Sequence, residues 1–228
     1  MKKKSIAIII ALVILVIVGV LAYIGTADLR QASTLRAEAQ KLSEMDIEKD
    51  NVDMDIKTTG EYAVIEQTMK EYINKYSTTL KELEVILDDD KISELLTAEN
   101  YKNDGPDFVE TKKYITETRE SFNEKMQTLI DMTSQEKMME AIEEKNLSQE
   151  YVDLYKELML GENMTEDLKE AVESLQESSE IINKILDIQD NIIDLLIENK
   201  GKWEVSDEGE IQFESQQLVN KYNEFLDS

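Results

Sequence analysis

The chain has 228 residues, 50 of them acidic and 25 basic, and it contains no histidine and no cysteine. The missing residues exclude a Ser-His-Asp triad, a thiol nucleophile, a disulfide scaffold, an iron–sulfur cluster and a typical zinc site. The formal charge of −25 argues against nucleic-acid binding, because a basic surface would have to neutralise the phosphates. Carboxylates, hydroxyls, amides and aromatic rings remain as functional groups, and no cofactor is expected.

A long apolar segment follows the N-terminal Met1-Lys-Lys-Lys. Residues 5–27 form an uncharged run of 23 residues. As a helix this run would be about 35 Å long, which exceeds the roughly 30 Å hydrocarbon core of a bilayer. It therefore predicts a transmembrane signal anchor embedded in the lipid bilayer. Cleavage after small residues at Ala22 or Ala27 is the alternative, in which the segment is a signal peptide.

The lysines before the anchor predict its orientation. Positive residues next to a first membrane segment favour the cytoplasmic side, so residues 1–4 are expected to be a cytoplasmic stub. The chain after the anchor is then extracytoplasmic. Abundant Lys, Ile, Asn and Glu, with little Ala, Arg, Gly and Pro, suggest an AT-rich bacterial genome. We therefore expect a single-pass protein of the bacterial cell membrane.

Residues 28–60 are expected to form a stalk helix and an acidic linker. The helix is predicted over residues 27–45, where no Gly or Pro occurs and apolar residues recur at helical spacing. The members of this stripe are Ala32, Leu35, Ala39 and Leu42. Residues 46–60 lose the pattern and are rich in carboxylates.

Residues 61–200 predict an antiparallel helical bundle. Apolar stripes recur at helical spacing. They lie at Ile65–Leu87, Phe108–Ile130, Met138–Ile142, Tyr151–Met159 and Leu168–Leu196. Asn103-Asp104-Gly105-Pro106 is the clearest break and holds the only proline. The last stripe is wide enough to bury against more than one helix, which favours a bundle over a two-stranded coiled coil.

Residues 201–228 change from helical to alternating periodicity. Trp203 and Val205 precede a turn at 206–209, and Ile211 and Phe213 follow it. This pattern predicts a β-hairpin, which has to pack on the bundle because an isolated hairpin is marginally stable. A final helix capped by Ser215 is expected after it.

Four aromatic residues of this C-terminal region are candidate partner-contact residues: Trp203, Phe213, Tyr222 and Phe225. They suit an exposed recognition patch, and they suit a small core between hairpin and helix equally well. Five tyrosines fall on or beside the apolar stripes, where core packing is a better interpretation than a ligand groove. They are Tyr62, Tyr72, Tyr76, Tyr151 and Tyr155.

Two acidic clusters could supply oxygen ligands to calcium. One contains Asp88, Asp89, Asp90 and Glu94, and the other contains Asp50, Asp53 and Asp55. Neither has the Gly and terminal Glu of an EF-hand loop, so a solvated acidic face is the preferred interpretation and no metal site is predicted. Carboxylate pairs for glycoside hydrolysis arise by chance among 50 acids, and we expect no enzyme activity.

Together these features predict an all-α protein with an N-terminal transmembrane helix, a stalk, an extracytoplasmic bundle, a small hairpin and a final helix. The expected role is non-catalytic, as an interaction or structural protein of the envelope that binds a protein partner or itself. One alternative is an extracytoplasmic sensor or a bundle that binds a small ligand or cation and acts through a membrane partner. A second alternative is a secreted acidic protein released by signal cleavage.

Overall fold

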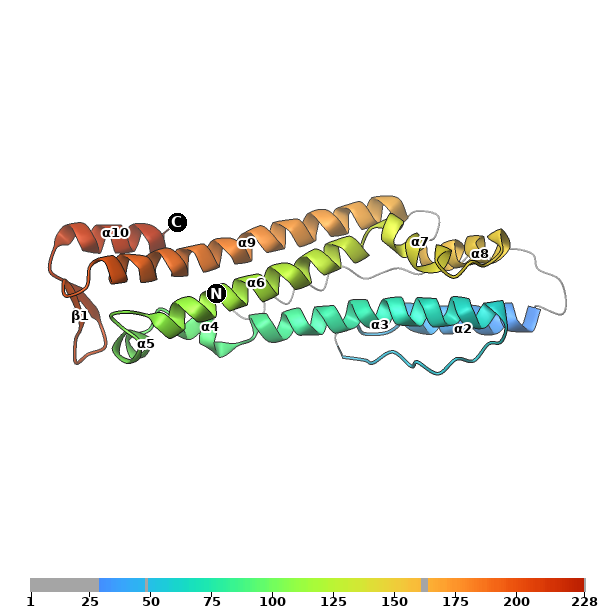
Figure 1. Cartoon of the computed structure of the whole chain (residues 1–228), viewed down its shortest axis with the longest axis horizontal. Coiled ribbons are helices and arrows are strands. Elements are labelled where there is room, and N and C mark those ends of the chain that lie inside the picture. The colour runs from blue at the N-terminus through green and yellow to red at the C-terminus, as the bar shows by residue number, and fades with distance from the viewer. Residues whose placement is uncertain (1–28, 48, 161–163, 228) are drawn as a thin grey trace. The chain divides into compact units, whose positions relative to one another are not determined.

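The computed structural model describes residues 29–47, 49–160 and 164–227, and this part of the chain is mostly helical (Figure 1). Its helices are α2 (Leu29–Ser43), α3 (Glu61–Leu87), α4 (Asp90–Glu94), α5 (Ala98–Asn103), α6 (Val109–Met132), α7 (Gln135–Glu143), α8 (Gln149–Leu160), α9 (Met164–Glu198) and α10 (Gln216–Leu226). Strands β1 (Trp203–Val205) and β2 (Ile211–Phe213) lie between α9 and α10. The predicted helical fold with a hairpin and a final helix is confirmed.

The predicted membrane anchor, residues 5–27, lies outside the described residues. Among the helices that the structure does describe, none combines the length and the apolar character needed to cross a bilayer.

Short polar side chains begin several helices. Ser134 starts α7 by accepting the backbone N–H of Lys137, and Ser215 starts α10 by accepting the N–H of Leu218. These bonds satisfy N–H groups that have no partner within the helix. The predicted cap at Ser215 is therefore confirmed.

The contacts divide the chain into two compact units. Unit 1 takes its described residues from the segments that end at Leu83 and that run from Lys125 to Glu177. Unit 2 consists of Glu84–Glu124 and Ser178–Ser228. Residues 61–200, predicted as one bundle, thus contribute to both units, and the predicted domain boundaries stay predictions.

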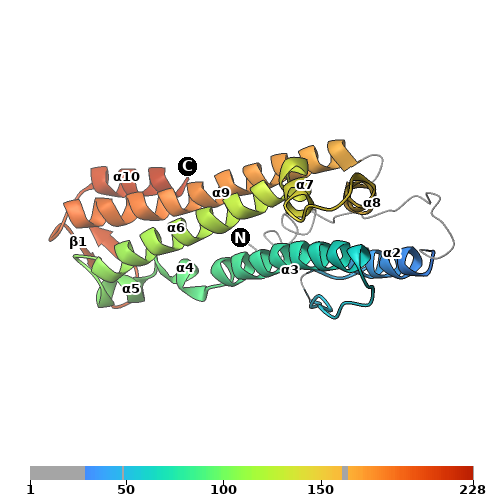
Figure 2. The same ribbon diagram turned by 45° about the vertical axis from the view of Figure 1, so that its right-hand side comes forward.

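Unit 1 has a core of aliphatic, methionine and tyrosine side chains, to which α2, α3, α6, α7 and α8 contribute. The apolar stripe of α2 is buried, as its spacing predicts, so this helix packs along its length within the unit (Figure 2). Large side chains that are fully buried here include Leu35, Ile65, Met69, Ile73, Tyr76, Leu83 and Tyr155. The predicted stalk helix is thereby part of a folded core.

An extended segment between α2 and α3, residues 51–59, is called the strap below. Val52 and Thr58 bury their side chains, at 8% and 5% exposed. At the start of the strap, Lys81 of α3 donates to the backbone carbonyl of Asp50 at 2.6 Å and to the side chain of Asn51 at 3.1 Å. The strap is thus held along α3.

Unit 2 is built around a smaller apolar cluster from α5, α6, α9 and the residues that follow α4 and precede α6. Its buried members are Leu95, Tyr101, Phe108, Ile115, Ile192, Ile193 and Leu196. The hairpin and α10 pack against this cluster. In the hairpin Trp203 pairs with Phe213 and Val205 with Ile211, so the apolar residues share one face. The predicted hairpin is confirmed, with Gly209 at a positive φ of 82° in its turn.

Candidate functional site

The four predicted partner-contact residues all lie in unit 2 and are all half-buried against its apolar cluster. The Trp203 ring stacks on Phe108 with centroids 5.8 Å apart, and its indole N–H donates to the Leu196 carbonyl at 2.8 Å. Phe213 contacts Tyr222 with centroids 5.3 Å apart. The rings therefore contribute to a core, the second of the two interpretations, and their role in partner contact stays a prediction.

The tyrosine hydroxyl groups of unit 2 support the same packing. Tyr101 and Tyr222 are hydrogen-bonded through their hydroxyl oxygens at 3.0 Å, which joins α5 to α10. Burial, together with this bond, raises the pKa of Tyr101 far above its usual value of 10.0. A neutral hydroxyl that is held in an apolar site stabilises the packing and is not available as a general base.

The most unusual polar site of the described chain lies in unit 1, where Lys70 is 1% exposed. Its ammonium nitrogen lies 2.8 Å from Glu38 Oε2 of α2, 2.7 Å from Glu66 Oε1 of α3 and 2.7 Å from the Asp55 carbonyl of the strap. An ammonium group has three donors, so these bonds use all of them. We call Glu38, Glu66 and Lys70 the buried ion cluster.

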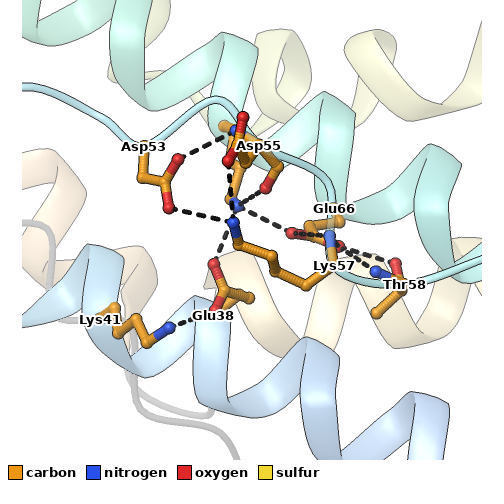
Figure 3. Close-up of polar contacts among 8 residues, drawn as sticks. Glu38, Lys41, Asp53, Asp55, Lys57, Thr58 and Glu66 are labelled. Atoms are coloured by element: carbon orange, nitrogen blue, oxygen red, sulfur yellow. Dashed lines mark hydrogen bonds and ion pairs between the residues drawn. The ribbon is translucent and has the colours of Figure 1, made fainter.

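Glu66 is 0% exposed and joins the buried ion cluster to the strap (Figure 3). Its carboxylate accepts the backbone N–H of Lys57 at 3.0 Å and that of Thr58 at 2.9 Å. It also accepts the Thr58 hydroxyl at 2.7 Å. One side chain thus bonds a part-buried amide at Lys57 together with an amide and a hydroxyl at Thr58 that would otherwise be buried without partners.

The pKa values in the buried ion cluster all shift in favour of the charged forms. Burial alone would raise the pKa of Glu66, but hydrogen bonds from Lys70 and Thr58 lower it overall. The pKa of Glu38 behaves in the same way, with Lys41 and Lys70 as donors. Burial would lower the pKa of Lys70, but the two carboxylates raise it overall. All three groups are therefore ionised near neutral pH.

The buried ion cluster has little capacity for catalysis or ligand binding, because all three donors of Lys70 are already bonded. A catalytic or ligand-binding lysine needs a free donor or a neutral amine, whereas Lys70 has three bonded donors and a raised pKa. The arrangement suits a structural role, in which one cation joins three segments of unit 1.

Sequence reasoning did not single out Glu38, Glu66 or Lys70, although a signal for them exists. Glu66 and Lys70 are four residues apart on the flank of the apolar stripe of α3, and Glu38 follows Leu35 by three residues on the buried face of α2. A charged residue at a helix position where the spacing of the apolar residues predicts burial indicates a buried partner of opposite charge.

The acidic clusters bond to groups of the protein itself. Asp89 accepts the backbone N–H of Lys91 at 2.9 Å and the hydroxyl of Tyr114 at 2.7 Å. Asp53 and Asp55 pair with Lys57 at 3.5 and 3.1 Å. Within residues 29–47, 49–160 and 164–227, no three acidic side chains are arranged to hold a metal ion.

A groove of about 560 Å³ lies on unit 1 between α3, α6 and α7. Its ionisable lining residues have both signs: Glu71, Lys75, Asp131, Lys137, Glu140, Glu144 and Lys145. Several already have partners, because Gln67 donates to Glu71, Gln127 donates to Asp131, and Lys137 pairs with Glu140. Of the five candidate tyrosines, Tyr72 also lines this groove, and its hydroxyl donates to the Met132 carbonyl.

The other tyrosines pack inside unit 1. Tyr62, Tyr76 and Tyr155 are 4%, 0% and 0% exposed, and Tyr62 meets Tyr151 edge to face with centroids 5.3 Å apart. These contacts agree with the core interpretation.

Comparison of the chain with protein-family models, with curated proteins and with solved structures found no match.

Proposed function

We propose that the chain is a non-catalytic protein of the bacterial envelope, anchored by residues 5–27 with its N-terminus in the cytoplasm. Its helical part lies outside the cell as an antiparallel bundle that carries the hairpin and final helix. There it serves as an interaction or structural module, through a protein partner or through self-association.

The observation that supports this proposal is the position of α2 in the sequence, close behind residues 5–27. Helix α2 begins at Leu29, two residues after the end of the uncharged segment 5–27. It is fastened to α3 by the Glu38–Lys70 ion pair at 2.8 Å, across 32 residues of sequence. If residues 5–27 span the membrane, only Asp28 separates them from a helix of the packed core, so unit 1 would be held close to the bilayer.

The charge supports a protein partner rather than the lipid surface. The chain has twice as many acidic as basic residues, and anionic lipid headgroups repel such a surface. The bonded state of Lys70 and Glu66 also favours a framework over a catalytic centre. The functional surface would then be the outer faces of the helices.

Fractionation with intact mass measurement tests the anchor. The native chain is isolated from its own cells, and the membrane pellet is washed with alkaline carbonate and with high salt. The proposal predicts a carbonate-resistant membrane protein with the mass of the uncleaved chain. A soluble product shortened by the mass of the first 22 or 27 residues would overturn it in favour of the secreted acidic protein.

The groove of unit 1 is the observation that supports a second candidate function, a bundle that senses a small ligand and acts through a membrane partner. Its volume suits a small molecule. Lys137, Asp131 and Glu71 of its lining already bond to other side chains of the protein, so the interaction role is preferred.

A further inference from the structure

We propose that α2 and the strap open from unit 1 as one cooperative element, coupled through the single ammonium group of Lys70. This device is independent of where the protein resides, so it goes beyond the proposed function. It concerns α2, the first helix that the structure describes.

The coupling follows from how the donors of Lys70 are divided. One bond holds α2 through Glu38, one holds the strap through the Asp55 carbonyl, and one stays within α3 through Glu66. All three nitrogen–oxygen distances are between 2.7 and 2.8 Å, and the lysine side chain is 1% exposed. Undocking of α2 removes one carboxylate from a buried cation, which weakens the site that also holds the strap.

Glu66 links the Lys70 ammonium group to two further residues of the strap. It bonds to Lys70 and also to the amides of Lys57 and Thr58, so the position of its carboxylate depends on the cation. Within the described residues, the bonds of the Glu38 side chain are with Lys41 and Lys70. Of these two bonds, the one to Lys70 leads on to the strap, so a change at Glu38 reaches the amides of Lys57 and Thr58 through the cation.

One exposed bond links α2 and the strap directly, and it provides a matched control. The side-chain oxygen of Gln31 accepts the backbone N–H of Thr59 at 3.0 Å. Because water competes for this pair, its loss has little effect on opening. If the coupling passes through the buried cation, a change at Glu38 should affect the strap more than a change at Gln31. If it passes through the surface bond, the order should be reversed.

Hydrogen exchange of the full-length chain in detergent micelles tests the proposal, read at single-amide resolution. In Glu38→Met, the amides of Lys57 and Thr58 are expected to exchange about tenfold faster or more, together with the amides of α2. In Gln31→Ala they are expected to change less than about twofold. Reciprocally, Thr58→Val is expected to accelerate exchange in α2, because coupling between two sites is mutual.

Glu38→Gln keeps the shape of the side chain and decides the matter if Glu38→Met unfolds unit 1. With this variant, faster exchange in both α2 and the strap supports the proposal. Faster exchange in α2 with the Lys57 and Thr58 amides unchanged would overturn it. A larger effect of Gln31→Ala than of Glu38→Gln on those two amides would also overturn it.

Discussion

Lys70→Met is the substitution that probes the framework of unit 1 most severely. The variant keeps the length of the apolar stem but removes a cation that is 1% exposed. It leaves Glu38 and Glu66 buried without their shared partner. Removing one member of a buried ion pair costs about 3–5 kcal/mol, because the remaining charge is uncompensated. We expect a loss of this size in the free energy of unfolding of unit 1.

Urea unfolding followed by far-ultraviolet circular dichroism measures this loss. The single tryptophan, Trp203, lies in unit 2, so its fluorescence follows the other unit separately. Lys81→Met is the matched control, since Lys81 is only half-buried and its bonds to Asp50 and Asn51 are exposed to solvent. It is expected to change the free energy by less than about 0.5 kcal/mol. A Lys70→Met loss as small as that of the control would refute the reasoning.

The deficit of Lys70→Met should also depend on pH. In the native protein the lowered pKa of Glu66 gives stability that is present above its usual value of 4.5 and is lost as the pH falls through the folded pKa. Without Lys70 the burial of Glu66 is less opposed, so its pKa rises and the carboxyl binds a proton more readily. The deficit is therefore expected to shrink between about pH 8 and pH 5. A deficit that grows over this range would contradict this explanation.

Three further outcomes are expected. Phe108→Ala should lower the unfolding free energy of unit 2 by about 3–5 kcal/mol, because the ring is 0% exposed and stacks on Trp203. Urea unfolding followed by tryptophan fluorescence measures this loss, and an unchanged midpoint would contradict the packing. Burial raises the pKa of Tyr76 to about 12, so stability should fall as the pH rises above 10.0, and a urea midpoint that stays constant over this range would contradict the burial of this hydroxyl. Millimolar calcium should leave the melting temperature unchanged, and a clear upward shift would show binding to the native state.

Local patterns were sufficient to predict most of the helices, the hairpin and the cap at Ser215. Each depends on residues a few positions apart, such as the turn that ends in Gly209 and the alternation around Trp203. The second interpretation of the aromatic patch agrees with the structure because the same alternation places Trp203 and Phe213 on one face.

The buried ion cluster was not predicted, because its pairing depends on tertiary structure. Glu38 and Lys70 are 32 residues apart, and the strap between them has no periodicity that reveals its path. Carboxylates in this region predict a solvated linker, and nothing local shows that Glu66 binds the amides of Lys57 and Thr58. The division of the contacts into two units likewise arises from long helices that contribute to both.

Cysteine labelling in intact cells tests the proposed topology most directly, because the chain has no cysteine of its own. Asp207→Cys places a thiol in the exposed turn of the hairpin, and Lys3→Cys places one before the anchor. A membrane-impermeant maleimide is expected to label Asp207→Cys in intact cells and Lys3→Cys only after lysis. Labelling of Asp207→Cys only after lysis would contradict the placement of the folded chain outside the cell.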